Sequence, residues 1–463
     1  MVSISKPGRR TNVFRPAADG RPPVQTVVRN AKLVTLPVAF AGRQAAGLGS
    51  RALGRSADEV QRDIQIRTAQ HLFEVLGELK GAAAKLGQLM SLYEMALPPE
   101  FAEPYRTALG RLQDAAPAML PRGVEAAMAA SMGPDWQWYF RQFDSRRAAA
   151  ASIGQVHRGV WRDGTPVAVK IMYPGARQAV RSDLEQLRRL SVLARVFLRG
   201  AEVEPVLEAL CDAIDDELDF AAEAEYQRAF ARAYAGSDDF RIPEVIEQRG
   251  DVLISEWLPG IPVTRLVDYG SPRERDRVGM LMVRFVTSGW GAHGLLYSDA
   301  HLGNFRVLPD GRLGVVDFGA CSPFPPPGFD ELAVDLCEAI FHGTPAMLEA
   351  AIRRHGFVEH GRDFDVDALA ALLATGSEPV RHTSYRLSAG WLRELVLEVT
   401  TPRLSNVMRQ LTAPAYLTPF ARAALTLVAG LTQLETEGRF REEILRWVPA
   451  LDGVLDRDAA AGC

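Results

Sequence analysis

Two short clusters of polar residues near the middle of the chain contain residue types that suit phosphoryl transfer. Asp299 and Asn304 are five residues apart, and Asp317 opens an Asp-Phe-Gly tripeptide thirteen residues later. A carboxylate such as Asp299 can accept the proton of an attacking hydroxyl, while an amide oxygen and a second carboxylate suit Mg²⁺ on nucleotide phosphates. Each cluster alone could be a polar turn beside a buried strand. The ordered pair predicts a magnesium-dependent phosphoryl-transfer centre.

This spacing is that of the catalytic and magnesium loops of protein kinases. Such a centre requires an upstream lysine on a strand, and Lys170 lies in the apolar run of residues 167–171. A lysine at the end of an edge strand is the alternative, but apolar residues flank Lys170 on both sides. We expect Lys170 to bind the α- and β-phosphates. Its carboxylate partner is expected on the acidic helix 212–230, where Asp219 and Glu223 share one face and repel.

A glycine-rich loop over the phosphates is expected before the Lys170 strand, and the sequence does not supply it. A serine and a run of alanines stand there instead: Ala148, Ala149, Ala150, Ala151 and Ser152. Because a Cβ atom disfavours positive φ, this segment cannot close over phosphates as glycine does. We expect nucleotide to be held in a different geometry. The alternative is that the alanines only pack at the start of a helix.

These motifs together resemble the UbiB (AarF-domain) family of atypical kinases, and in detail its coenzyme Q kinase members. The resemblance covers about residues 65–440 and rests on four signatures in order. They are Lys-x-Gly-Gln at Lys85, Gly87 and Gln88, the alanine-rich segment, Glu-x-Asp at Glu217 and Asp219, and the catalytic pair.

The resemblance implies a role for each site residue. Lys170 pairs with Glu223 in the active arrangement, and Asp299 acts as the catalytic carboxylate. The ligands are expected to be ATP or ADP with Mg²⁺, the metal being held by Asn304 and Asp317. The segment with Lys85, Gly87 and Gln88 is expected to cover the mouth of the site and to meet Glu217 and Asp219. An amphipathic helix with one solvated lysine is the alternative for that segment.

The strand 252–258 runs into Pro259 and Gly260, and we expect this hinge to bind the adenine edge through backbone groups. Its residues are Ser255, Glu256, Trp257 and Leu258.

The catalytic loop departs from the usual family pattern His-x-Asp-Pro-His-Pro-Gly-Asn. This chain has Tyr297 at the first His, and Ala300 and Leu302 at the two Pro positions. Proline would stiffen the loop through its fixed φ. Loop rigidity and substrate choice are therefore expected to differ. His301 is interpreted as a structural, hydrogen-bonding residue rather than a neighbour of the metal.

The predicted fold is α+β and mostly helical: a protein-kinase-like, two-lobed fold with an added N-terminal helical layer that carries Lys-x-Gly-Gln. The length of 463 residues and a hydrophobic content of 47% allow a large core and two or three domains. No internal repeat is visible. The expected segments are a basic, flexible arm (1–56), the family-specific helical segment (57–145), the small lobe (146–260) and the large lobe (261–463).

Charge is unevenly distributed, because residues 1–56 carry +9 within a chain of net charge −4. Such an arm forms a core poorly and could attract anionic lipids; a solvated tail is the alternative. Aromatic residues are not interleaved with the basic residues of this arm, so nucleic acid binding is not expected.

The sequence has no apparent transmembrane or signal segment. We expect a cytoplasmic protein whose membrane contact, if any, is peripheral, although an Arg-rich start also resembles a mitochondrial transit peptide. The four cysteines show no zinc spacing and indicate a reducing compartment.

Two classes of function are compatible with these features. One is an ATP-dependent phosphotransferase or ATPase in quinone or isoprenoid-lipid metabolism. The other is a pseudokinase that changes shape with nucleotide and regulates partner enzymes. A small-molecule kinase of the aminoglycoside type is a third reading, but it would not need Lys-x-Gly-Gln. The expected partners are nucleotide, an anionic membrane surface, lipid-biosynthesis enzymes and a second copy of the chain.

Overall fold

The structure is a computed structural model. It describes residues 118–185, 215 and 218–455, apart from residues 152, 179, 183, 359–360, 401–406, 408–409 and 413. The predicted arm 1–56 and most of the predicted segment 57–145 lie outside the described residues. The same holds for five predicted site residues: Lys85, Gly87, Gln88, Ser152 and Glu217.

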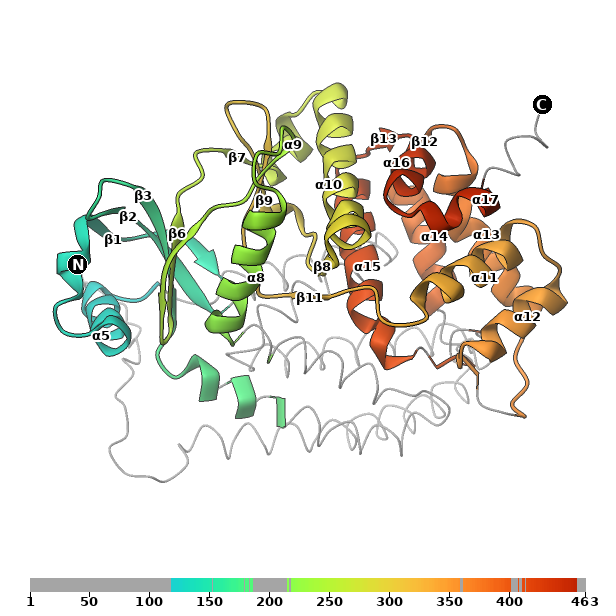
Figure 1. Cartoon of the computed structure of the whole chain (residues 1–463), viewed down its shortest axis with the longest axis horizontal. Coiled ribbons are helices and arrows are strands. Elements are labelled where there is room, and N and C mark those ends of the chain that lie inside the picture. The colour runs from blue at the N-terminus through green and yellow to red at the C-terminus, as the bar shows by residue number, and fades with distance from the viewer. Residues whose placement is uncertain are drawn as a thin grey trace, which may run out of the picture. The chain divides into compact units, whose positions relative to one another are not determined.

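A five-stranded antiparallel sheet forms the first part of the described chain (Figure 1). Its order is β1-β2-β3-β6-β5, with bounds β1 (Phe140–Ala151), β2 (Gly154–Trp161), β3 (Pro166–Met172), β6 (Val252–Glu256) and β5 (Val245–Arg249).

Strand β3 shows why Lys170 faces away from the core of this sheet. Val167, Val169 and Ile171 are fully buried and pack with Met128 of helix α5 (Pro121–Met132). Because successive side chains of a strand point to opposite faces, Lys170 lies on the other face. The helix on that side is α8 (Phe220–Ala233), which contacts β5 and β6.

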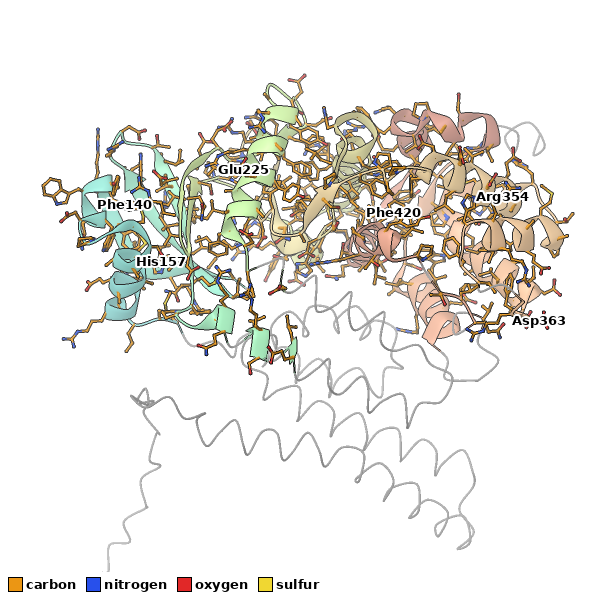
Figure 2. All side chains as sticks on the ribbon, turned by 60° about the horizontal axis from the view of Figure 1, so that its bottom comes forward. Phe140, His157, Glu225, Arg354, Asp363 and Phe420 are labelled. Atoms are coloured by element: carbon orange, nitrogen blue, oxygen red, sulfur yellow. The ribbon has the colours of Figure 1, made fainter. Side chains whose placement is uncertain are left out.

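Buried polar residues join the sheet to the chain before α5. His157, labelled in Figure 2, is fully buried on β2 beside Gln155. The Nε2 atoms of these side chains are 2.7 Å apart, and the side-chain Oε1 of Gln155 accepts from the Met119 amide at 2.9 Å. His157 Nδ1 lies 2.9 Å from the Asp144 carbonyl oxygen. These bonds fix β1 and β2 together next to the alanine-rich segment.

Helix α10 (Pro272–His293) precedes the loops that carry the predicted catalytic residues. A reciprocal pair of bonds between Ser271 and Glu274 caps its start, and Gly294 at φ 68° ends it. Other elements in this part of the chain are β4 (Phe240–Arg241), β7 (Ile261–Pro262), α9 (Thr264–Tyr269), β8 (Leu295–Tyr297), η2 (Leu302–Asn304), β9 (Phe305–Val307), β10 (Leu313–Val315) and β11 (Cys321–Pro323).

Two small sheets hold these loops. One has the order β4-β10-β9-β7, and the other pairs β8 with β11 in antiparallel fashion, with Tyr297 opposite Cys321. Residues 298–304 follow β8 and residues 316–320 precede β11. The pairing therefore brings the two predicted catalytic loops together.

Helices form the last part of the described chain. They are α11 (Phe329–Phe341), α12 (Pro345–Arg354), α13 (Val366–Arg381), α14 (Ala389–Thr400), α15 (Thr418–Gln433), α16 (Phe440–Trp447) and α17 (Asp452–Leu455), with a strand pair β12 (Tyr385–Arg386) and β13 (Glu437–Gly438). Phe420, labelled in Figure 2, packs in an aromatic cluster with Trp290, Phe324 and Phe329. Within the described ranges, no helix has both the length and the apolarity that a membrane span requires.

Candidate active site

Lys170 and Glu223 are distant in sequence, but their side chains are in contact on the face of the sheet that α8 covers. Lys170 Nζ of β3 lies 2.7 Å and 3.0 Å from the two carboxylate oxygens of Glu223 on α8. The same ammonium lies 3.2 Å from Asp317 Oδ2 and 5.1 Å from the centre of the Phe220 ring. The family resemblance implied that Lys170 pairs with Glu223, and the structure places the two side chains in contact.

Helix α8 begins in a way that positions Glu223 in its first turn. The Asp219 carboxylate accepts hydrogen bonds from the amides of Ala221 and Ala222, each at 3.0 Å, and so caps the helix. Glu223 therefore lies near the positive end of the helix dipole, where a carboxylate is favoured. The repulsion expected between Asp219 and Glu223 is offset because amides face the first and Lys170 faces the second.

Burial and charge set the ionisation of this pair. Burial lowers the pKa of Lys170, but the carboxylates of Asp317 and Glu223 outweigh it and hold that pKa above its usual value. Burial raises the pKa of Glu223 to about 7, with Lys170 opposing the change and Asp317 adding to it. Lys170 is therefore positive at neutral pH, and Glu223 is the member of the pair that titrates there.

Asp317 has a left-handed backbone, with φ at 68°. This conformation is uncommon for a residue with a Cβ atom and costs of order 1–3 kcal/mol. The hydroxyl of Tyr297 donates to the carbonyl oxygens of Asp317 at 2.9 Å and Val316 at 3.1 Å. The Asp317 carboxylate in turn accepts from the Gly319 amide at 3.3 Å. These contacts turn the carboxylate of Asp317 toward Lys170.

Hydrogen bonds to backbone groups hold the loop of residues 298–304 in place. Asn304 Nδ2 donates to the carbonyl oxygen of Asp299 at 3.0 Å, and the Val316 amide donates to the Asn304 carbonyl oxygen at 2.9 Å. The Gly303 amide donates to His301 Nδ1 at 3.1 Å, so His301 serves as a local hydrogen-bonding residue. The two loops with Asp299, Asn304 and Asp317 are thus linked directly.

The donor set at these loops fits Mg²⁺ bound to a nucleotide. A group of three or more His, Cys, Asp or Glu side chains that could hold a metal does not occur in the part of the chain that the structure describes. Mg²⁺ is usually held by one or two carboxylates, with waters and substrate phosphates completing its octahedron. The carboxylate of Asp317 and the amide oxygen of Asn304 are ligands of that kind.

The alanine-rich segment is extended rather than helical. Ala148 to Ala151 are the last residues of β1, and Ala151 pairs with Gly154 of β2. A Cβ atom at Gly154 would lie 2.3 Å from the Ile171 carbonyl oxygen, so only glycine fits this close approach to β3. The alternative of a helix start is therefore wrong for these alanines.

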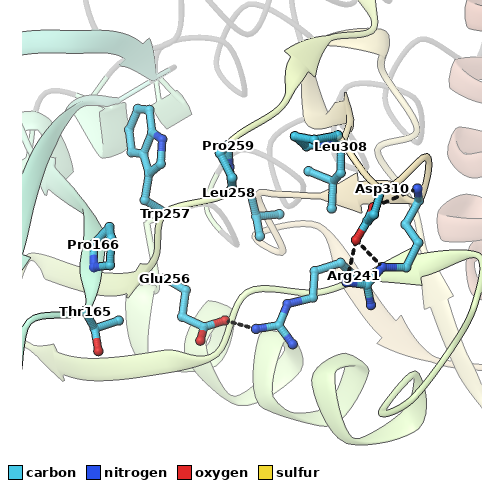
Figure 3. Close-up of a pocket in the computed structure, with 11 residues that line it drawn as sticks. Thr165, Pro166, Arg241, Glu256, Trp257, Leu258, Pro259, Leu308 and Asp310 are labelled. Carbon is cyan, nitrogen blue, oxygen red and sulfur yellow. Dashed lines mark hydrogen bonds and ion pairs between the residues drawn. The ribbon is translucent and has the colours of Figure 1, made fainter.

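The predicted hinge residues Glu256, Trp257 and Leu258 line a pocket of about 250 Å³, shown in Figure 3. The Glu256 carboxylate accepts from Arg241 at 2.6 Å, across the pocket. The amide of Trp257 donates to the Pro166 carbonyl oxygen at 2.9 Å, which fastens the hinge to β3. Ser255 lies within β6, opposite Ala168 of β3. Lys170 and Asp317 are not among the residues that line this pocket.

Sequence reasoning missed the residues of α15 that contact the loop of residues 298–304. Arg422 Nη2 lies 3.5 Å from Asp299 Oδ2, and the Ala300 amide donates to Thr426 Oγ1 at 3.1 Å. No local motif marks these positions. Cys321 is partly buried after the second loop, where burial raises its pKa well above the usual value.

Comparison with known proteins identifies the family. Residues 111–349 match the family described as the ABC1 atypical kinase-like domain, which is more than half of the chain, and the chain belongs to this family. The predicted resemblance to the UbiB (AarF-domain) kinases is thereby confirmed.

Curated relatives include mitochondrial proteins named atypical kinases. COQ8 of Schizosaccharomyces pombe is 29% identical over 277 residues, which cover 58% of this chain and 44% of that protein. The coq-8 protein of Caenorhabditis elegans is 27% identical over 299 residues, which cover 63% of this chain and 39% of that protein. The matched region thus spans less than half the length of either relative.

A solved structure supports the fold. The structure described as the complex of Rv3197 with erythromycin from Mycobacterium tuberculosis has a TM-score of 0.61 and 35% sequence identity to this chain. It covers 85% of this chain and 99% of its own. The predicted kinase-like α+β fold is confirmed, whereas the added N-terminal helical layer stays a prediction.

Proposed function

We propose that the protein binds Mg-ATP or Mg-ADP and acts as an atypical kinase or ATPase. The observation that carries this proposal is the three-way contact of Lys170 with Glu223 and Asp317. It places a permanent cation beside a carboxylate suited to Mg²⁺, on the face of the sheet opposite the apolar core. A purely structural ion pair would not require Asp317 to adopt a left-handed backbone.

In this proposal Lys170 binds the α- and β-phosphates, and Glu223 holds its ammonium in place. Asp317 and Asn304 hold Mg²⁺, which neutralises charge on the phosphates during transfer. Asp299 accepts the proton of the attacking hydroxyl. The alanines of β1 lie over the nucleotide, and backbone groups of the hinge bind the adenine edge. The carbonyl oxygen of Leu258 accepts from the Gly260 amide, which shapes that edge.

We also propose a role in quinone or isoprenoid-lipid metabolism, with the basic arm 1–56 contacting anionic membrane surfaces. The support is the name COQ8 carried by several relatives, together with the charge of the arm. Lys85, Gly87, Gln88 and Glu217, with Asp219, are proposed to regulate access to the site. Among these, Asp219 also caps α8, so movement of its carboxylate would disturb the turn that holds Glu223.

The alternative, a nucleotide-switched pseudokinase, draws support from the alanine-rich strand that replaces a glycine loop. ATP turnover separates the two. The full chain would be assayed with Mg-ATP, with and without liposomes and phenols that resemble quinone precursors. Turnover in the parent that falls about a hundredfold or more in Asp299→Asn supports a kinase or ATPase. Nucleotide binding without turnover under every condition would favour the pseudokinase.

A further inference from the structure

One face of helix α15 contacts the loop of residues 298–304, and we call the three residues on this face the stripe. Arg422, Thr426 and Gly430 are four residues apart, so they share one face of the helix. The Thr426 hydroxyl accepts from the Ala300 amide at 3.1 Å. A Cβ atom at Gly430 would lie 3.0 Å from Leu302 Cδ2, so glycine permits close packing there. The stripe therefore fixes the position of the loop that follows β8.

The first residue of the stripe supplies a positive charge to Asp299. Arg422 Nη2 lies 3.5 Å from Asp299 Oδ2, and the two side chains are 13% and 19% exposed. At this low exposure, solvent and salt screen the attraction less than they screen a surface pair. The hydroxyl of Thr426 donates to the carbonyl oxygen of Arg422 at 2.9 Å, so Thr426 is bonded both to the loop and to the backbone of Arg422.

The catalytic loop itself contains no strong cation. Residues 298–304 include neither Lys nor Arg, and His301 is bonded within the loop to the Gly303 amide. Lys170 is held by Glu223 and Asp317 on the nucleotide side. A carboxylate that faces the γ-phosphate needs compensation, because like charges repel across a site of low dielectric. Arg422 lies where it provides that compensation.

We propose that Arg422 is a positioning residue that holds the Asp299 carboxylate toward the acceptor hydroxyl and balances its charge. This inference rests on the proposed function. In the transfer, the acceptor O–H gives its proton to Asp299, and its oxygen forms a bond to the γ-phosphorus. The bond from the γ-phosphorus to the bridging oxygen breaks, which releases ADP. Arg422 acts through Asp299 and makes no bond to phosphorus.

A double-mutant cycle of ATP turnover tests this role in the full chain. The proteins are the parent, Arg422→Gln, Asp299→Asn and the double variant, and kcat and KM for Mg-ATP are measured for each. Arg422→Gln should lower kcat about tenfold or more, as expected when a general base is misplaced, while KM changes less than about twofold. Arg422→Lys should restore part of the loss. The double variant should turn over no more slowly than Asp299→Asn, since both changes act through one group.

Arg439→Gln is the matched control, because Arg439 is 65% exposed and pairs with Glu442 on α16. It should keep the turnover of the parent. Should Arg422→Gln fail to fold, Arg422→Met keeps the apolar stem and enters the same cycle. An unchanged kcat in the Arg422 variant would overturn the proposed role of Arg422 and leave the proposed function intact. The same holds if the losses of kcat in the two single variants multiply in the double variant. A parent without any turnover would instead remove the proposed transfer reaction, and the role of Arg422 with it.

Discussion

The hydroxyl of Tyr297 donates a hydrogen bond to the carbonyl oxygen of Asp317 at 2.9 Å. Asp317 has a φ of 68°, so this bond supports a backbone conformation that most residues avoid. Tyr297 is fully buried, and burial raises its pKa well above the usual value, so the hydroxyl remains a donor. The residue that replaces the first histidine of the usual family pattern thus orients the carboxylate proposed to hold the metal.

Tyr297→Phe should weaken the site and the fold together. It leaves the carbonyl oxygens of Val316 and Asp317 without this donor, which costs about 1–3 kcal/mol in the free energy of unfolding. Denaturant unfolding measures that loss, and thermal shift measures the stabilisation by Mg-ADP, which should decrease. Tyr297→His, which has the residue usual in the family, should retain more of the Mg-ADP effect. Equal stabilisation in parent and Tyr297→Phe would show that the hydroxyl does not position Asp317.

Glu223 should make stability depend on pH near neutrality. Its pKa is raised from 4.5 to about 7 in the folded chain, so the folded state binds its proton more tightly than the unfolded state. The free energy of unfolding attributable to Glu223 therefore falls as pH rises from 4.5 to 7, by about 1–3 kcal/mol. Unfolding of the parent and of Glu223→Gln would be compared across this range. A difference between them that does not vary with pH contradicts the assignment.

Gly154→Ala should destabilise the sheet strongly. The added Cβ atom would lie 2.3 Å from the Ile171 carbonyl oxygen, which is backbone and cannot turn aside. A shift of β2 against β3 is then required, with an expected cost of about 2 kcal/mol or more. Gly175→Ala is a useful comparison, because Gly175 has positive φ but no atom within 4 Å of an added Cβ. A Gly154→Ala variant that unfolds at the same denaturant concentration as the parent would show that β2 and β3 accommodate the added Cβ atom.

Contiguous motifs explain why most of the charged centre could be predicted from the sequence. Asp299, Asn304 and Asp317 lie in two short loops, and Lys170 stands out in an apolar strand. Glu223 required the family resemblance, because the sequence alone offered two carboxylates on one helix face. The structure distinguishes them: Glu223 contacts Lys170, whereas Asp219 caps the helix.

Contacts made by distant helices could not be predicted in this way. Arg422 meets Asp299 only because α15 packs against the loop after β8, and a single arginine on an amphipathic helix has no recognisable signature. Tyr297 was recognised as a departure from the family pattern. Its role depends on the left-handed backbone of Asp317, which sequence does not reveal for a residue other than glycine.

If Asp317 and Lys170 form a Mg-nucleotide site, both residues are needed for nucleotide to raise the melting temperature of the protein. Melting of the parent, Asp317→Asn and Lys170→Met would be followed with ADP or ATP, with and without Mg²⁺. Binding of nucleotide to the folded state raises the melting temperature of the parent by mass action, and Mg²⁺ should increase that rise. Asp317→Asn should lose the effect of Mg²⁺ on the melting temperature, and Lys170→Met should lose most of the effect of nucleotide. Full Mg²⁺-dependent stabilisation in Asp317→Asn would contradict a Mg-nucleotide site formed by these residues.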